Sequence, residues 1–267
     1  MRYVAKIFAL FVIISLLFIV HPMFSQSSDN PPLPGFDLEG SDAKAIEIAD
    51  AVMTAMGGRE NWNNTRHITW KFLGGRLNIW DKYTGNIRVE SRGLTVLMNL
   101  HTEKGRAWQD GEEITHPDSL AKKIQYGKDV WINDSYWVVM PYKLKDSGVT
   151  LTYQGEGTLS DGRPCDILQL TFKNVGRTPD NKYLVFVGKE TNLVEKWEFF
   201  RNAEDAEPRI TNVWGNWLKY GNIMLSDYRG EREGEPFGHK DIAVFDELPA
   251  SVYESPEPVD MMSFVKK

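Results

Sequence analysis

The chain has 267 residues, of which 42% are hydrophobic, 25% charged and 12% aromatic, a composition typical of a globular protein with a substantial core. This composition excludes a disordered, a collagen-like and a polytopic membrane protein. Acidic residues outnumber basic ones by 37 to 31, so binding to nucleic acid, which needs clustered cations, is not expected.

The first residues have the pattern of a secretory leader. Arg2 and Lys6 precede an apolar run over residues 7–20, and a small residue follows at Ser25. The order predicts a signal peptide over residues 1–25, cleaved between Ser25 and Gln26. A membrane anchor is the alternative, but the run is shorter than the roughly twenty residues that a spanning helix needs. Cleavage removes two cations and no acid, which changes the formal charge from -6 to -8.

A helix is predicted over residues 42–56. Its apolar positions recur at intervals of three and four residues, which is the period of a helix with one buried face. Ser41 is suited to cap its N-terminus, and Gly57 with Gly58 is suited to end it in a left-handed conformation. The chain should therefore enter its first sheet directly after this helix.

From Arg66 the pattern changes to short apolar runs separated by turn residues, which is typical of a β-meander. A second helical segment is predicted over residues 117–140, with Pro117 in its first turn and Pro141 limiting its length. Gly127 and the pair Asn133-Asp134 are candidate breaks within it. Strands are predicted over residues 68–73, 76–80, 87–90, 94–100, 149–153, 166–173, 183–187, 193–201, 209–214, 223–229 and 241–245.

These elements show no regular alternation of strand and helix of the kind that a parallel sheet needs. They predict a mainly β fold with two helical segments (α+β). We expect one large curved antiparallel sheet, a half-barrel, with the helices covering its concave face, in a single domain over residues 35–250. Residues 251–267 contain Pro256 and Pro258 and are expected to form a loose C-terminal tail.

The sequence contains few candidates for catalytic or metal-binding residues. Cys165 is the only cysteine, so no intrachain disulfide is expected, and its neighbours predict a buried position on a strand. The histidines of the chain beyond the leader lack the short paired spacing of a metal site; they are His67, His101, His116 and His239. We therefore predict no catalytic, cofactor-binding or metal-binding residue, and no cofactor.

Three segments resemble the LolA-like superfamily of periplasmic lipoprotein carriers and sorting proteins. They are Ala55-Met56-Gly57-Gly58 with Trp62, residues 136–144, and the hairpin over residues 183–200; the resemblance covers residues 41–246. It implies a half-open antiparallel barrel with a helical lid, whose apolar interior holds the acyl chains of a lipid or lipoprotein. It also implies that the exported chain resides in the periplasm.

Aromatic residues are the candidates for contact with such a ligand. Trp70 with Phe72, and Trp197 with Phe199, alternate with polar neighbours and face inward from their strands. A packed core and a pocket lining both fit this alternation. The predicted ligand-binding residues are Trp70, Phe72, Trp108, Trp131, Trp197 and Phe199.

The predicted function is that of an exported, monomeric, non-enzymatic protein that shelters a hydrophobic small molecule or a lipoprotein acyl chain. An envelope protein is a further candidate partner. Two alternatives stay open. The chain could be an exported hydrolase acting on lipid or glycan, which needs histidines or carboxylates to converge in a cleft, or a subunit of an envelope complex with a filled core.

Overall fold

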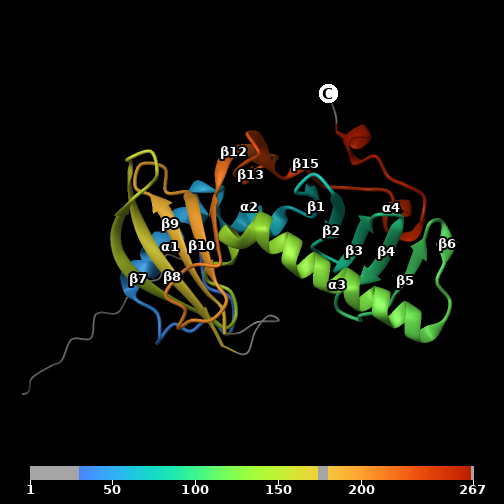
Figure 1. The fold of residues 1–267 in the computed structure, drawn as a ribbon, viewed down its shortest axis with the longest axis horizontal. Coiled ribbons are helices and arrows are strands. Elements are labelled where there is room, and N and C mark those ends of the chain that lie inside the picture. The colour runs from blue at the N-terminus through green and yellow to red at the C-terminus, as the bar shows by residue number, and fades with distance from the viewer. Residues whose placement is uncertain (1–29, 174–179, 266–267) are drawn as a thin grey trace, which may run out of the picture.

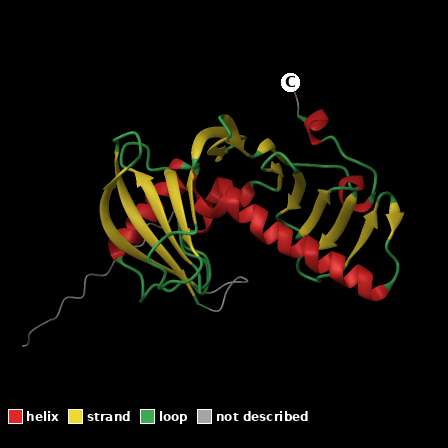
Figure 2. Cartoon of the chain, viewed as in Figure 1, coloured by secondary structure: helices red, strands yellow, loops and turns green. Residues whose placement is uncertain are grey.

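The structure is a computed structural model that describes residues 30–173 and 180–265. The predicted signal peptide and its cleavage site lie outside the described residues. Figure 1 shows an elongated molecule with one large sheet toward each end and a small sheet between them, and Figure 2 shows that one long helix runs along one large sheet and ends near the other. No helix within the described ranges is both long and apolar enough to cross a membrane.

The larger sheet contains seven antiparallel strands in the order β15-β1-β2-β3-β4-β5-β6. Five of its connections join neighbours in the chain, as a meander requires, and the last strand of the chain pairs with the first through His67 and Phe245. The strands are β1 (His67–Phe72), β2 (Arg76–Asp81), β3 (Asn86–Ser91), β4 (Leu94–Asn99), β5 (Gly105–Gln109), β6 (Glu112–Glu113) and β15 (Lys240–Phe245).

The second sheet contains five antiparallel strands in the order β11-β10-β9-β8-β7, and a third contains β12-β13-β14. The chain passes from one to the other at Trp214, between β11 and β12. The strands are β7 (Val149–Thr158), β8 (Pro164–Phe172), β9 (Lys182–Gly188), β10 (Val194–Phe200), β11 (Ile210–Val213), β12 (Gly215–Tyr220), β13 (Ile223–Arg232) and β14 (Glu235–Gly238).

The predicted fold class, mainly antiparallel β with helices packed on the sheets, is confirmed. The expected single sheet is divided into three separate sheets, and none of them closes into a barrel. One hydrophobic core nevertheless joins them, because its buried residues come from both large sheets, the small sheet and the helices; among them are Val52, Trp70, Val138, Leu151, Trp197, Trp214 and Leu225.

The first helix, α1 (Ala43–Ala55), packs with its apolar stripe against the five-stranded sheet. The predicted cap was wrong: Asp42 occupies the N-cap position, and the Ser41 hydroxyl instead accepts a hydrogen bond of 2.9 Å from the Leu151 amide. Ser41 thus fastens the start of α1 to the edge strand β7. Cys165 is buried on β8, as predicted.

The Met56-Gly57-Gly58 segment has a clear steric role. Gly57 has φ of 110°, and a Cβ there would lie 2.3 Å from the Asn222 carbonyl oxygen, so glycine alone fits. This close approach lets the Met56 carbonyl accept hydrogen bonds from the Met224 amide at 3.0 Å and the Tyr142 hydroxyl at 2.8 Å. A short helix that the sequence did not predict, α2 (Gly58–Asn64), begins here.

The long helix α3 (Pro117–Val139) is continuous, so Gly127 and Asn133-Asp134 do not break it. Gly127 is buried against β4, where a Cβ would lie 2.7 Å from Val96 Cγ1. The glycine is therefore a requirement of close helix–sheet packing. Pro141 ends the α-helix as predicted, and the chain continues as the 3-10 helix η1 (Met140–Lys143).

A buried ion pair holds α3 on the seven-stranded sheet. The Asp134 carboxylate has no exposed surface and accepts hydrogen bonds from Arg76 at 2.6 and 2.9 Å and from the Asn78 amide at 3.1 Å. Both partners stand on β2. This two-pronged geometry fixes the height and rotation of the helix above the strand.

The C-terminal segment is packed and not loose, so that expectation is corrected for the described part. Residues 250–264, called the strap below, contain α4 (Ser251–Glu254) and the 3-10 helix η2 (Met261–Phe264) and cover the sheet face opposite α3. Arg88 on β3 is fully buried and donates to the carbonyls of Val252 and Ser255 at 3.1 and 2.7 Å. The guanidinium thus donates hydrogen bonds to strap carbonyls, in a proline-containing segment with little regular secondary structure.

Candidate ligand-binding site

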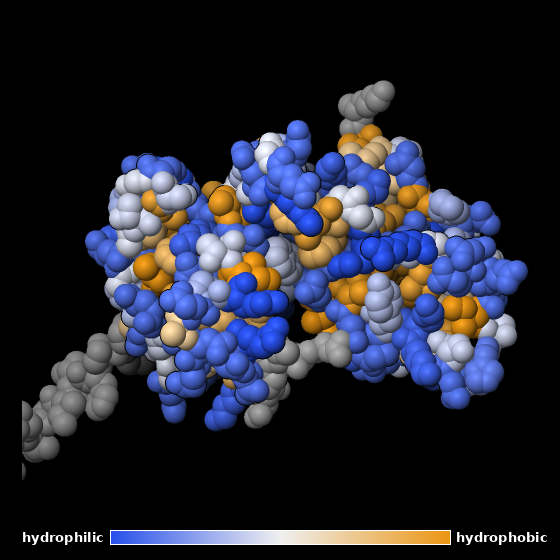
Figure 3. All heavy atoms as spheres, in the orientation of Figure 1, coloured by the Kyte–Doolittle hydropathy of each residue, from blue (hydrophilic) through white to orange (hydrophobic). Residues whose placement is uncertain are grey.

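Aromatic side chains from three parts of the fold meet where α3 reaches the five-stranded sheet. We call this set the aromatic wall; all its members except Trp197 are partly exposed, and it consists of Phe72, Tyr136, Trp137, Phe172, Tyr183, Trp197 and Phe199. Figure 3 shows hydrophobic residues, coloured orange, in the region between the two large sheets, where α3 ends. Clusters of partly exposed rings are typical of surfaces that bind apolar partners.

The rings of the wall form one connected series. Trp137 packs edge-on against Phe72 and Trp197, with centroid distances of 5.9 and 5.0 Å. Tyr183 then stacks on Trp197 at 5.2 Å and lies 5.2 Å from Phe199. These distances are those of favourable aromatic pairs, so the wall is one packed surface and not a set of independent side chains.

Strand parity explains why β9 and β10 supply these rings to the same side. Trp197 pairs with Val185, and Phe199 pairs with Tyr183, in an antiparallel register. Partners in such a register point to the same face of a sheet. The same face packs against α1 farther along the strands, so the wall continues the inner surface of the sheet beyond the part that the core fills.

On the helix side of the wall, Pro141 leaves the backbone carbonyl of Trp137 without a helical hydrogen bond. Proline has no N–H, so the Trp137 carbonyl lacks its usual helical donor. The guanidinium of Arg229 donates to this carbonyl at 2.5 Å, and His239 Nε2 lies 3.2 Å from it. His239 Nδ1 accepts a bond of 3.4 Å from the Leu73 amide, which assigns the ring proton to Nε2.

Both of these side chains are buried, and the pKa of each is lower than its ordinary value. Burial lowers the pKa of Arg229 to about 9. Burial also lowers the pKa of His239 well below its ordinary value, and the charge of Arg229 lowers it further, so His239 is neutral at neutral pH. The guanidinium carbon of Arg229 lies 3.9 Å from the centre of the Trp214 ring, behind Trp197.

The structure brings together three of the six predicted ligand-binding residues, Phe72, Trp197 and Phe199. Trp131 lies farther along α3, edge-on to Trp80 at 5.1 Å. Trp70 has no exposed surface and belongs to the core. Trp108 follows the α3-facing Ala107 on β5, so it points to the opposite face of the sheet.

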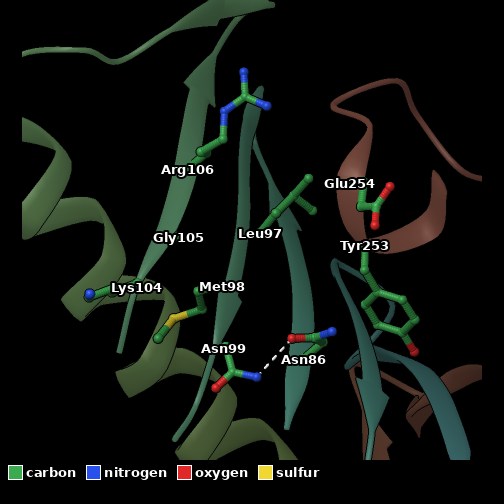
Figure 4. A pocket seen from close by; sticks show the side chains of 9 residues that line it. All are labelled: Asn86, Leu97, Met98, Asn99, Lys104, Gly105, Arg106, Tyr253 and Glu254. Carbon is green, nitrogen blue, oxygen red and sulfur yellow. Dashed lines mark hydrogen bonds between the residues drawn. The ribbon is translucent and has the colours of Figure 1, made fainter. Parts of the chain in front are cut away.

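Two grooves lie elsewhere, beside the strap. The groove in Figure 4 has a volume of about 320 Å³ and lies between β3–β5 and α4. Two of its polar groups are paired: the Asn99 amide donates to Asn86 at 2.8 Å, and Arg106 binds Glu113 at 2.7 and 2.8 Å. The other groove lies along residues 258–262. The first groove is lined by one aromatic side chain, Tyr253, and the second by none, so neither offers the connected ring surface of the aromatic wall.

The chain was also compared with known proteins. No family model matches it, and no curated protein matches it. Three crystal structures are similar: a DUF1329 family protein from Desulfovibrio piger (13% identity, 79% of this chain and 97% of that chain, TM-score 0.45), a putative outer membrane lipoprotein-sorting protein domain from Vibrio parahaemolyticus (12%, 79% and 96%, 0.42), and a LolA superfamily protein from Nitrosomonas europaea (13%, 78% and 96%, 0.40).

Two of these structures carry the lipoprotein-sorting or LolA name that the sequence segments led us to expect. At such identities the likeness is one of fold. Within this chain, two of the three segments touch each other: Trp62 stacks on Tyr142 with a centroid distance of 4.2 Å. The first two segments thus meet at the junction between α1, α2 and η1. The second and third segments also supply wall residues, among them Trp137 and Trp197.

Sequence reasoning missed Tyr136, Trp137, Phe172 and Tyr183. The helical period assigns Trp131 and Val138 to the buried face of α3. Trp137 lies off this face near the end of the helix, and there it contacts Trp197. The alternation along β9 contained a usable signal, because Tyr183 has the same parity as the buried Val185 and Val187. A search for aromatic residues at the ends of inward-facing stripes would have found it.

The four histidines occupy separate places. His67 on β1 lies 2.8 Å from the Tyr253 hydroxyl of the strap, and His239 supports the Trp137 carbonyl. His101 lies beside Gly85 in a turn, and His116 is the N-cap of α3. Within the described ranges, no group of three or more His, Cys, Asp or Glu side chains is arranged to hold a metal ion.

Proposed function

We propose that the protein is an exported periplasmic binding protein that holds the apolar chain of a lipid or lipoprotein against the aromatic wall, without catalysing a reaction. The observation that carries the proposal is the connected series of mostly partly exposed rings from β1, α3, β8, β9 and β10. A contiguous set of aromatic side chains that reaches the surface is the kind of patch to which apolar ligands bind.

The energetics favour a chain-like ligand. Each buried methylene contributes about 0.8 kcal/mol, so roughly ten methylenes supply about 8 kcal/mol before the cost of association is subtracted. A wall of rings can take up such a chain without any titrating group. We therefore expect the ligand to bind on an open surface, in place of the interior of the half-open barrel that the sequence resemblance implies.

A fluorescent fatty acid tests the proposal. Titration of cis-parinaric acid into the protein, purified without its leader, should give saturable fluorescence enhancement. Phe199→Ala removes a half-buried ring of the wall and should weaken binding several-fold. Tyr126→Ala, an aromatic deletion at a side chain of α3 that is 41% exposed, is the matched control and should leave binding unchanged. Absence of uptake by the folded wild-type protein, or equal weakening by both substitutions, contradicts the proposal.

A further inference from the structure

Buried hydrogen-bond donors accumulate behind the aromatic wall. Five polar atoms there are shielded from solvent and find no acceptor among the described residues: Tyr136 Oη, Trp197 Nε1, Asn212 Nδ2, Trp214 Nε1 and Arg229 Nε. We call these five side chains the donor cluster. Buried polar groups almost always have a partner, so five unpaired donors in one region call for an acceptor that the described residues do not supply.

The five side chains are neighbours. Trp197 and Asn212 are partners across β10 and β11, so both face the same side of the sheet. Trp214 lies 6.1 Å from Trp197, and Arg229 lies 3.9 Å from Trp214. Tyr136 joins the group through Tyr183, whose ring is 5.4 Å from Tyr136 and 5.2 Å from Trp197.

The donor cluster contains a positive charge without a counterion. Arg229 is 2% exposed, and its terminal nitrogens donate to the Ser226 hydroxyl and to the carbonyls of Trp137, Ser226 and Tyr228. No carboxylate of the described residues forms an ion pair with it. The adjacent Asp227 accepts instead from Asn216 at 2.7 Å. A buried charge of this kind is stabilised when an anion reaches it.

Tyr136 and Trp197 belong both to the wall and to the donor cluster. Through Trp214, Trp197 also links the wall to the uncompensated charge of Arg229, so the wall and the donor cluster form one packed set of side chains. We infer that the donor cluster is a head-group site for the carboxylate of a fatty acid whose chain lies on the aromatic wall. This inference rests on the proposed function and adds the chemical class of the ligand.

Access to the cluster passes through the wall. The ring of Tyr183 stacks on Trp197, and Phe199 lies 6.4 Å from Trp197; both are partly exposed, whereas Trp197 is 2% exposed. The inference requires these two outer rings to move aside when the ligand binds, so that its carboxylate reaches the indole N–H. The carboxylate then accepts the hydrogen bonds that the protein leaves unmade, and such charge-assisted bonds are the strong ones.

A series of ligands with the same chain tests the inference. Laurate below its micellar concentration, and methyl laurate and lauryl alcohol below their solubility limits, compete with cis-parinaric acid. We expect laurate to bind about tenfold more tightly than either neutral ligand, as one charge-assisted bond to a buried donor provides. Equal binding of laurate and the alcohol would overturn the head-group site while leaving the wall intact, and failure of all three would overturn the proposed function itself.

Conservative variants locate the effect. Trp197→Phe and Tyr136→Phe remove one donor each and keep the ring, so each should reduce the preference for laurate over the alcohol several-fold. Trp131→Phe is the matched control, because its indole nitrogen is also buried without a partner but packs against Trp80, outside the cluster. A laurate preference that survives in the first two variants, or that Trp131→Phe also abolishes, would contradict the assignment, as would methyl laurate binding as tightly as laurate.

Discussion

Pro141 determines the chemistry of several residues around it. Because the proline cannot donate to the Trp137 carbonyl, Arg229 and His239 take over that role from β13 and from the residue before β15. A buried carbonyl without a donor would cost about 1–3 kcal/mol. The replacement places a charged and a titratable group directly behind the aromatic wall, which makes this site sensitive to pH.

We expect acid to destabilise the fold through His239. Its pKa is lowered in the folded state by burial and by Arg229, so below about pH 6.5 the unfolded chain binds more protons than the folded one. The free energy of unfolding should therefore decrease as the pH falls from about 6.5 toward the folded-state pKa. Urea unfolding at a series of pH values measures this slope.

The His239→Gln variant isolates that contribution. Burial also lowers the pKa of His67, which acts in the same direction, so the readout is the difference in slope between wild type and variant. The variant should lose part of the acid slope, and His101→Gln, in an exposed turn, should keep it. Identical slopes for wild type and His239→Gln would show that the histidine is not held neutral.

At the scale of elements, the packing of α3 depends on Gly127. Alanine would improve the helix propensity by about 1 kcal/mol, but its Cβ would lie 2.7 Å from a methyl group of the buried, β-branched Val96. The steric term is the larger, so Gly127→Ala should lower the free energy of unfolding by about 1–2 kcal/mol. In a Val96→Ala background the same substitution should be neutral or stabilising. Additive effects of the two changes in denaturant unfolding would refute this account.

The strap depends on one arginine. Arg88 donates to four strap carbonyls, those of Val252, Ser255, Pro256 and Glu257, and so replaces the hydrogen bonds of regular structure. Arg88→Met should release the strap and accelerate amide hydrogen exchange in residues 252–255, with α3 little affected. Exchange that stays slow in the strap of the folded variant would mean that the apolar contacts of Val252 and Met261 suffice to hold it.

For the whole molecule, sequence patterns predicted local structure better than its assembly. The helical period predicted α1 and α3, and the turn glycines predicted the β1–β3 meander, because these signals are local. Three other features depend on contacts between distant segments: the pairing of His67 with Phe245, the division into three sheets and the docking of the strap. Proline content suggested a loose tail because no local signal reveals that Arg88 will bind its carbonyls.

The candidate site shows the same limit. Alternation identified Phe72, Trp197 and Phe199, whose side chains share the inward faces of their strands. It could not reveal that Trp108 faces away, since the strand of Trp108 was not predicted, or that Trp137 meets Trp197 across the end of a helix. Contacts between a helix end and a strand have no period that a sequence can display.

The location of the bound chain tests the account most directly. A fatty acid with a photoreactive group at its chain end, irradiated with the protein and mapped by mass spectrometry of peptides, reports which surface it occupies. The account predicts labels in the segments 131–139 and 183–199, suppressed by an excess of laurate. Labels concentrated in the strap, or in the groove that contains Asn86 and Asn99, would place the ligand on the opposite face of the molecule and contradict it.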